Sequence, residues 1–206
     1  MNSVPSLESS ANPSVSTPSA FIVAGTGHRP DKLGGYGKVA QGKVFEMAKK
    51  ALKDSLELAK DRPLKLISGM ALGWDQALAL AAVELEIPFC AAVPMRGFQQ
   101  RWPAESQSFY FELLKEAAKV VYVDEVEDIK YQRLNGFVPP GLYSVQKMQT
   151  RNVWMVDKCH HVVALWDGSA GGTKNCLDYV RGCGKPWRNY YSEFSGASSQ
   201  MKLDFM

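Results

Sequence analysis

Short, almost wholly apolar segments alternate with longer segments of helical periodicity from residue 20 onward. A strand that is apolar on both faces is typical of a parallel sheet covered on each side, because a strand with one wet face alternates polar and apolar residues. The alternation therefore predicts an α/β fold: a doubly wound, mostly parallel sheet of five to six strands with helices on both faces, which is Rossmann-like. The expected strands cover residues 21–24, 64–68, 88–93, 120–123, 162–166 and 186–190.

The segments between these strands predict the helices. Apolar residues at positions 44, 47, 48, 51, 52, 56 and 59 lie on one face of a helix expected at residues 39–59. Further helices should end near Glu86, cover residues 104–118 and 144–157, and begin near Thr173. A long connection that contains Pro139 and Pro140 is expected before the helix at residues 144–157.

The length of 206 residues fits a single domain, which we place at residues 20–206. Residues 1–19 are rich in Ser and Pro, carry one charge at Glu8, and lack the basic start and apolar run of a secretory signal. They offer too little apolar surface to offset the entropy lost on ordering. We therefore expect a disordered N-terminal tail.

The charge and the cysteine content restrict the classes of partner and the cellular compartment that we expect for this protein. The net charge of +3 comes without a long basic run, so the sequence does not indicate a nucleic-acid partner. Four cysteines without a CxxC spacing favour reduced thiols and a cytoplasmic location. No window approaches 18 consecutive apolar residues, so we expect no membrane partner.

Residues 161–180 read as an apolar strand, a glycine-rich turn and a helix. Glycines let the backbone approach a ligand closely, and the helix N-terminus offers unpaired N–H groups to a phosphate. Thr173 can cap the helix and still turn its hydroxyl toward an anion. The alternative is a tight strand–helix turn that binds nothing. The candidate ligand-binding residues here are Asp167, Gly168, Ser169, Gly171, Gly172 and Thr173.

Polar or glycine-rich loops also follow the first three strands. Ligands of open α/β sheets bind outside the carboxyl ends of the strands, so these loops should share one rim with the glycine-rich turn. The candidates are Gly25, Thr26, Gly27, His28 and Arg29 after the first strand, Ser68, Gly69, Met70, Gly73, Trp74 and Asp75 after the second, and Arg96 and Arg101 after the third.

Three of these residues have chemical roles to offer. Arg29 could pair with a phosphate through its planar fork, and His28 could donate to one or act as an acid. Asp75 could accept from a ribose hydroxyl or act as a general base, which makes it the candidate catalytic residue. Each also has an ordinary explanation, since His28 and Arg29 could be solvated loop residues and Asp75 a helix-capping one. Arg151 and Asn152 could face the same crevice, but periodicity alone does not aim them.

Several known motifs are incomplete, and their absence excludes classes of function. Gly25 and Gly27 begin a dinucleotide fingerprint, but Pro30 stands at its third glycine, so we expect no NAD and no other cofactor. Residues 37–44 lack the Ser or Thr that a P-loop needs for magnesium. Cys159, His160, His161 and Cys176 match no zinc spacing, and no metal is expected.

Several segments together resemble the SLOG superfamily, most closely its small stand-alone bacterial and phage proteins. They are GTGHRPDKLGGY, SGMALGWDQALALAA, residues 99–102, RNVWMVD and LWDGSAGGTKNCLDY, and the resemblance covers residues 21–191. It implies a Rossmann-like sheet with a pocket for nucleotides or nucleotide-derived ligands. Superfamily members include Lonely-Guy phosphoribohydrolases, DprA-type DNA-binding proteins and sensor domains of antiviral defence systems that read cyclic ADP-ribose-like signals.

The resemblance carries over unevenly. Gly171, Gly172 and Thr173 match part of the PGGxGTxxE motif of Lonely-Guy enzymes, but Cys176 stands at the position of their catalytic glutamate. Phosphate binding is therefore implied, whereas N-glycosidic hydrolysis by the same machinery is in doubt. Asp75 or Asp178 would have to substitute for that glutamate.

The glycine-rich turn predicts a phosphate-containing ligand, and the resemblance implies that this ligand is a nucleotide or a nucleotide-derived molecule of ADP-ribose-like or cyclic type. Sensing or sequestering that molecule in phage–host defence is the expected role. The alternative is a Lonely-Guy-like hydrolase of nucleoside monophosphates or related N-glycosides, and a DprA-type DNA-associated module is a third class. We also expect a homo-oligomer, because Val145, Met148, Trp154 and Met155 exceed what one narrow helix face needs.

Overall fold

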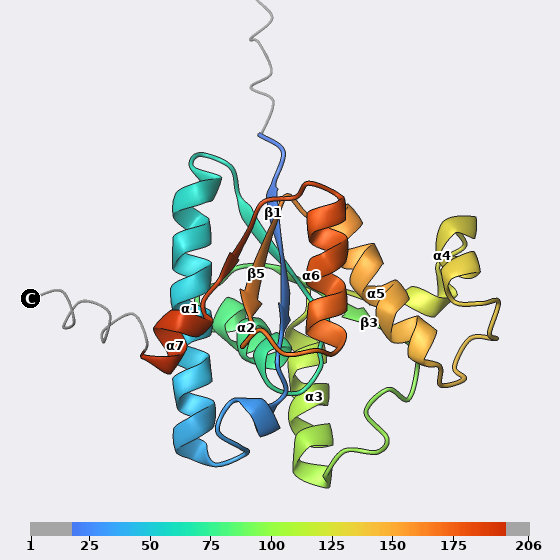
Figure 1. Cartoon of the computed structure of the whole chain (residues 1–206), viewed down its shortest axis with the longest axis horizontal. Helices are drawn as coiled ribbons and strands as arrows, with labels where there is room; N and C mark the ends of the chain where they lie inside the picture. The colour runs from blue at the N-terminus through green and yellow to red at the C-terminus, as the bar shows by residue number, and fades with distance from the viewer. Residues whose placement is uncertain (1–17, 197–206) are drawn as a thin grey trace, which may run out of the picture.

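The computed structural model describes residues 18–196 (Figure 1). The predicted tail at residues 1–19 lies outside the described residues except for its last two positions, as do residues 197–206 of the predicted domain. The Arg62 guanidinium donates hydrogen bonds to the carbonyls of Ser19 and Ala20, at 2.7 and 2.8 Å. These bonds fix the point at which the chain enters the first strand.

Within residues 18–196, six strands form one sheet in which all neighbours run parallel, in the order β4-β3-β2-β1-β5-β6. This confirms the predicted fold class. The chain steps outward from β1 to β4 and then returns to the other side of β1, so the sheet has a topological switch point between β1 and β5. The strands are β1 (Phe21–Gly27), β2 (Leu64–Ser68), β3 (Phe89–Val93), β4 (Lys119–Tyr122), β5 (His161–Leu165) and β6 (Trp187–Asn189).

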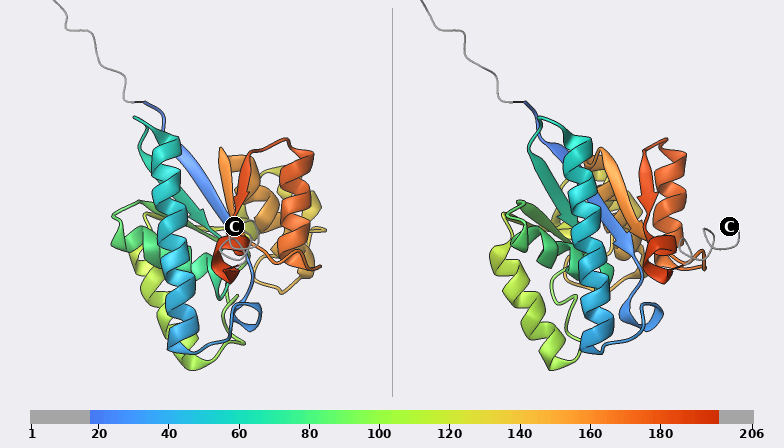
Figure 2. Two further views of the ribbon diagram at one scale, coloured as in Figure 1. Left: turned by 60° about the vertical axis from the view of Figure 1, so that its left-hand side comes forward. Right: turned by 90° about the vertical axis from the view of Figure 1, so that its left-hand side faces the viewer.

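Helices cover both faces of the sheet, as the views in Figures 1 and 2 show. α1, α2 and α3 lie on one face, and α5 and α6 on the other. None of the described helices is long and apolar enough to cross a membrane. The helices are α1 (Lys38–Ala59), α2 (Trp74–Glu84), α3 (Ala104–Glu116), α4 (Ile129–Leu134), α5 (Val145–Lys158), α6 (Gly172–Gly182) and α7 (Tyr191–Ser195), with 3-10 turns at Pro30–Lys32 and Val123–Glu125.

Each face of the sheet has its own apolar core. On the first face, Val44, Ala48 and Leu52 of α1 are fully buried, and their spacing of four residues is the helical repeat predicted from the sequence. On the second face, Val156 of α5 and Leu177 of α6 pack over the strands. Burial of a Val or Leu side chain stabilises the fold by about 1.5–3 kcal/mol, so these two stripes hold the helices on the sheet.

β1 is longer than the sequence predicted, because it continues to Gly27 instead of ending at residue 24. Gly25 and Gly27 were expected in a ligand-binding loop, but both lie within the strand. A Cβ on Gly27 would lie 2.5 Å from the Trp74 ring, and one on Gly25 would overlap Leu78. These glycines therefore let α2 pack directly on β1.

The connection expected at residues 124–143 contains the short helix α4, which Asp128 caps by accepting a hydrogen bond of 2.8 Å from the Lys130 N–H. Six residues are too few for a helical repeat to be visible in the sequence. The apolar residues of α5 that were expected to mark an oligomer interface do not share one environment. Met155 is buried in the core, whereas Val145 is exposed.

Candidate functional site

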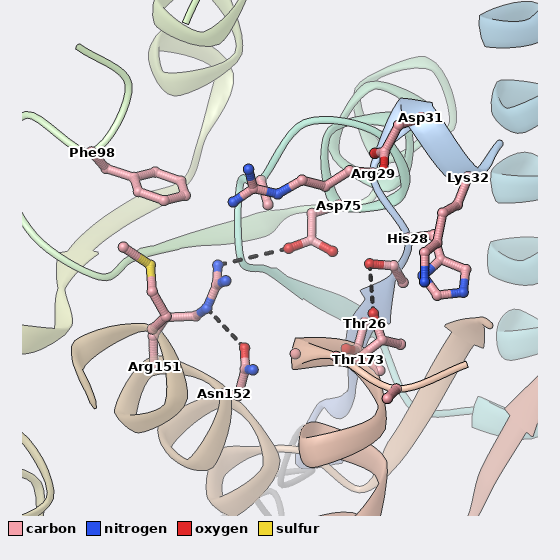
Figure 3. A pocket seen from close by; sticks show the side chains of 16 residues that line it. Thr26, His28, Arg29, Asp31, Lys32, Asp75, Phe98, Arg151, Asn152 and Thr173 are labelled. Atoms are coloured by element: carbon pink, nitrogen blue, oxygen red, sulfur yellow. Dashed lines mark hydrogen bonds and ion pairs between the residues drawn. The ribbon is translucent and has the colours of Figure 1, made fainter. Parts of the chain in front are cut away.

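A cavity of about 360 Å³ opens at the carboxyl ends of β1 and β5, beside the switch point (Figure 3). We call it the first cavity. The structure brings together eight of the predicted site residues in its lining: Thr26, Gly27, His28, Arg29, Asp75, Gly171, Gly172 and Thr173. Asp31, Lys32, Ala71, Phe98, Met148, Arg151, Asn152 and Ala170 complete the lining.

The N-terminus of α6 faces the first cavity without a side-chain cap. Gly171 is the N-cap residue, with φ of 142°, and a Cβ on Gly171 or Gly172 would meet nothing within 4 Å. The space next to the first N–H groups of the helix is therefore open. No acidic residue lies in the first turn, so the positive end of the helix dipole is not neutralised from within α6.

Thr173 does not cap α6, which corrects the prediction. It lies inside the first turn, and its hydroxyl donates a hydrogen bond of 3.0 Å to the Gly27 carbonyl. This bond ties the start of α6 to the end of β1. Because the hydroxyl proton is used in this way, an anion at the helix would be bound mainly by backbone N–H groups.

The turn before α6 is held by a small polar cluster. The His28 ring is nearly buried, and its Nε2 lies 2.6 Å from Asp167 Oδ1. The Ser169 hydroxyl and backbone N–H also donate to this oxygen. These bonds, with that of His28, hold the pKa of Asp167 well below its usual range. Asp167, Gly168 and Ser169 directly precede the lining residues Ala170 to Gly172 and are not themselves in the lining of the first cavity. Their contacts support the turn, and their predicted ligand contact stays a prediction.

Asp75 lies at the start of α2 and is 6% exposed. Burial raises the pKa of its carboxyl to about 6, although Arg151 and Arg29 and a backbone hydrogen bond with Ala71 oppose this shift. Asp75 Oδ2 is 3.7 Å from Arg151 Nη1. In Figure 3 the carboxyl lies between Arg29 and Arg151 and faces the cavity. It can therefore accept hydrogen bonds when ionised and donate one when protonated.

Arg151 approaches the cavity from α5, on the opposite face of the sheet from α2. Its Nη1 donates to the Gly69 carbonyl, and its Nε donates to Asn152 Oδ1 at 3.0 Å. Burial lowers the pKa of this guanidinium, and the Asp75 carboxylate partly offsets the effect. The sequence offered Arg151 and Asn152 as residues that could face the crevice, but helical periodicity alone did not give the direction of their side chains. The signal lay in the helical spacing of four between Arg151 and Lys147, two charged residues on a buried face.

The remaining predicted residues of the second loop lie beneath the site and do not line it. Trp74 is fully buried, and its indole N–H donates to the Val163 carbonyl at 3.2 Å, so the expected contact with a base is wrong. Gly69 leaves the space that the Arg151 guanidinium occupies. The others are structural as well: Ser68 donates to the Asp75 carbonyl at 2.7 Å, Met70 is fully buried, and Gly73 is the N-cap of α2 with φ of 92°.

Arg96 and Arg101 line a neighbouring cavity and not the first one. Arg96 Nε donates to Glu125 Oε1 at 2.6 Å, and its guanidinium lies 4.0 Å from the centre of the Tyr122 ring. Arg101 lies over Tyr143, 5.5 Å from the ring centre. Neither of these two candidate ligand-binding residues therefore lines the first cavity.

Comparison with known proteins gives a relative in a prophage and two solved structures with the same fold. No model of a known protein family matches the chain. The SPbeta prophage-derived protein YoqJ of Bacillus subtilis (strain 168) is 33% identical over 129 residues, which cover 60% of this chain and 73% of YoqJ.

The solved structures are those of DNA processing protein A (DprA) from Streptococcus pneumoniae and from Helicobacter pylori. Their TM-scores are 0.55 and 0.53, each at 14% identity, over 88% and 83% of this chain. The matched parts are 56% of the Streptococcus pneumoniae chain and 65% of the Helicobacter pylori chain, so this chain spans less than two thirds of the length of either DprA. At this identity the likeness shows the fold alone. The chain has the Rossmann-like fold of the two DprA structures and belongs to the family of the prophage protein YoqJ.

Proposed function

We propose that this protein binds a nucleotide or a nucleotide-derived small molecule in the first cavity, with a phosphate at the N-terminus of α6. The observation that carries the proposal is the uncapped helix N-terminus, with two glycines whose surroundings are open, at the switch point of the sheet. Backbone N–H groups and the helix dipole together favour a phosphate at such a position.

Cationic groups beside the helix support an anionic ligand. Arg29 lines the cavity, and within residues 18–196 it pairs with no carboxylate. Its planar fork suits bidentate binding of phosphate oxygens. Lys32 lies nearby and donates to the Ser169 hydroxyl. The phosphate would thus be bound between α6 and the chain that follows β1.

Asp75 supplies a polar contact for the rest of the ligand. A nucleotide offers ribose hydroxyls and base N–H groups, which are donors to an ionised carboxylate. Asp75 lies at the same cavity as the helix N-terminus, so one ligand can reach both. A role in sensing or sequestering a signal in phage–host defence remains part of the proposal, and it rests on the prophage origin of YoqJ.

Gly172→Val tests the phosphate site. The valine side chain would fill the open space in front of the first helical N–H groups. Loss of a hydrogen bond to a charged group costs about 1.5–3 kcal/mol, so affinity should fall about ten- to a hundredfold. Gly182→Val is the matched control, because it lies at the other end of α6, where a Cβ also meets nothing within 4 Å.

Calorimetry with adenosine monophosphate and ADP-ribose, together with mass spectrometry of any small molecule released from the denatured protein, gives the readout. Wild-type protein and Gly182→Val should bind these nucleotides with equal affinity, and Gly172→Val should bind them more weakly. Equal affinity of all three proteins, or the absence of any bound or binding nucleotide, contradicts the proposal.

The hydrolase alternative is favoured by one observation, the pKa of about 6 at Asp75, which lets this carboxyl exchange a proton near neutral pH. Repeated release of free base or ribose phosphate from a nucleoside monophosphate, lost in Asp75→Asn with binding retained, would establish it. A pure binder should give no product, and Asp75→Asn should only change its affinity.

Single-stranded DNA is the third candidate ligand. DNA processing protein A from Helicobacter pylori binds single-stranded DNA, which weighs against the expectation of no nucleic-acid partner for this chain. A gel-shift assay at several salt concentrations distinguishes this case, since DNA affinity through phosphate contacts falls steeply with salt.

A further inference from the structure

A second cavity of about 370 Å³ adjoins the first. The two share Arg29, Phe98 and Met148 in their linings, so these three side chains form the boundary between them. In Figure 3 the Arg29 guanidinium extends toward Phe98, on the side of the first cavity away from His28. The loop after β3 and residues 141–143 before α5 provide the other walls.

The second cavity is strongly cationic. Arg29, Arg96 and Arg101 are among its lining residues, and no carboxylate of residues 18–196 is. Glu125 holds Arg96 with two hydrogen bonds of 2.6 and 3.0 Å, which leaves Arg29 and Arg101 without a carboxylate partner within the described residues. Two unneutralised guanidinium groups at one cavity favour a ligand with negative charge.

The same cavity presents aromatic and soft apolar side chains. Phe98 and Trp102 meet edge to face, with ring centroids 5.0 Å apart, and Tyr143 lies beneath Arg101 and is 61% exposed. Met95 and Met148 complete the apolar part. Aromatic faces beside arginines are typical of sites that stack a nucleobase and hold the phosphate next to it.

We propose that the second cavity is a further subsite of the same ligand, which is therefore a dinucleotide-type molecule with two ring-bearing halves joined by phosphate. This inference rests on the proposed function. One half would occupy the first cavity with its phosphate at α6, Arg29 would bind the bridging phosphate at the boundary, and the other half would lie between Arg101 and the aromatic side chains. Each cavity is near the lower end of the range of about 300–1,000 Å³ for small-molecule sites, and so suits one half of such a ligand.

The test compares a one-part and a two-part ligand on the full chain by calorimetry. The probes are adenosine monophosphate and diadenosine diphosphate, and the variants are Arg101→Gln and Tyr143→Ser, which change exposed side chains. Each variant should lower the affinity for diadenosine diphosphate about tenfold or more and leave that for adenosine monophosphate unchanged. Lys115→Gln is the control, because this exposed lysine of α3 lines neither cavity.

Gly172→Val reports on the first cavity alone, so the two proposals fail in different ways. If Gly172→Val weakens both probes while Arg101→Gln weakens neither, or weakens both equally, the second subsite is refuted and the proposed function stands. Two adenosine monophosphates per chain, in place of one diadenosine diphosphate, would also refute a single two-part ligand. Salt-dependent binding of an oligonucleotide without binding of either probe refutes both proposals.

Discussion

Asp75→Asn should remove a pH dependence of stability of about 3 kcal/mol. Burial raises the pKa of this carboxyl from 3.8 to about 6, so the folded chain keeps a proton that the unfolded chain releases between about pH 4 and pH 6. Where the folded state binds more protons, the free energy of unfolding falls as the pH rises, by about 1.36 kcal/mol per unit of pKa difference. A difference of about two units gives the stated magnitude. The stability is present below the unfolded pKa and is lost once the pH exceeds about 6.

Urea unfolding of both proteins at intervals from about pH 4 to pH 7 measures this effect. Buffers should contain no phosphate, because an anion in the first cavity would stabilise the folded state and mask the result. The asparagine keeps the size of the side chain and has no proton to lose. The free energy of unfolding of Asp75→Asn, minus that of the wild type, should therefore be about 2.4 kcal/mol higher at pH 7 than at pH 4, because the rest of the change lies below pH 4.

Glu57→Gln is the matched control, because it removes a carboxyl from the exposed surface of α1, away from both cavities. Its difference from the wild type should be nearly constant over the same pH range. A difference for Asp75→Asn that is equally constant would refute the argument, since it would mean that the buried carboxyl ionises as readily in the folded chain as in the unfolded one. A residue that destabilises the fold at neutral pH is typical of a functional site.

Two further predictions concern α5 and the segment before it. Lys147→Met should lower the free energy of unfolding by about 3–5 kcal/mol, because it leaves the fully buried Asp124 carboxylate, 2.8 Å from Lys147 Nζ, without its cation; chemical denaturation measures this. The protein should form a homo-oligomer through the N-terminal part of α5, where the apolar Val145 is 70% exposed, and light scattering that gives a monomer at micromolar concentration would contradict this.

The fold could be predicted from the sequence because its signals are local and repeated. Each apolar run became a strand within a few residues of the predicted bounds, and β2 (Leu64–Ser68) matched both of them. The short helices α4 and α7 were missed because five or six residues do not complete two helical turns. Their formation depends on caps and on packing against neighbours that lie outside the local pattern.

The rim of the sheet could be predicted, but the direction of each side chain on it could not. Trp74 was expected to face a ligand because it lies next to glycine in a loop. Its position at the start of α2 instead points the indole into the core under β1. For Arg151 the sequence left the direction of the side chain open, and a helix on the far face of the sheet brings it to the cavity. Both outcomes depend on how α2 and α5 pack across β1, which the sequence does not show.

The glycines were the main sequence feature that indicated the site, but they have two different roles in the structure. At Gly25 and Gly27 a side chain would collide with α2, so these residues are small because two elements pack in contact. At Gly171 and Gly172 a side chain would meet nothing. The φ of 142° accounts for glycine at Gly171, whereas neither packing nor a positive φ accounts for it at Gly172. An open position that carries glycine, beside unpaired helical N–H groups, leaves room for a group from outside the chain. The ligand should therefore be sought on the α6 side of β1, and substitutions at Gly25 or Gly27 should affect stability before they affect binding.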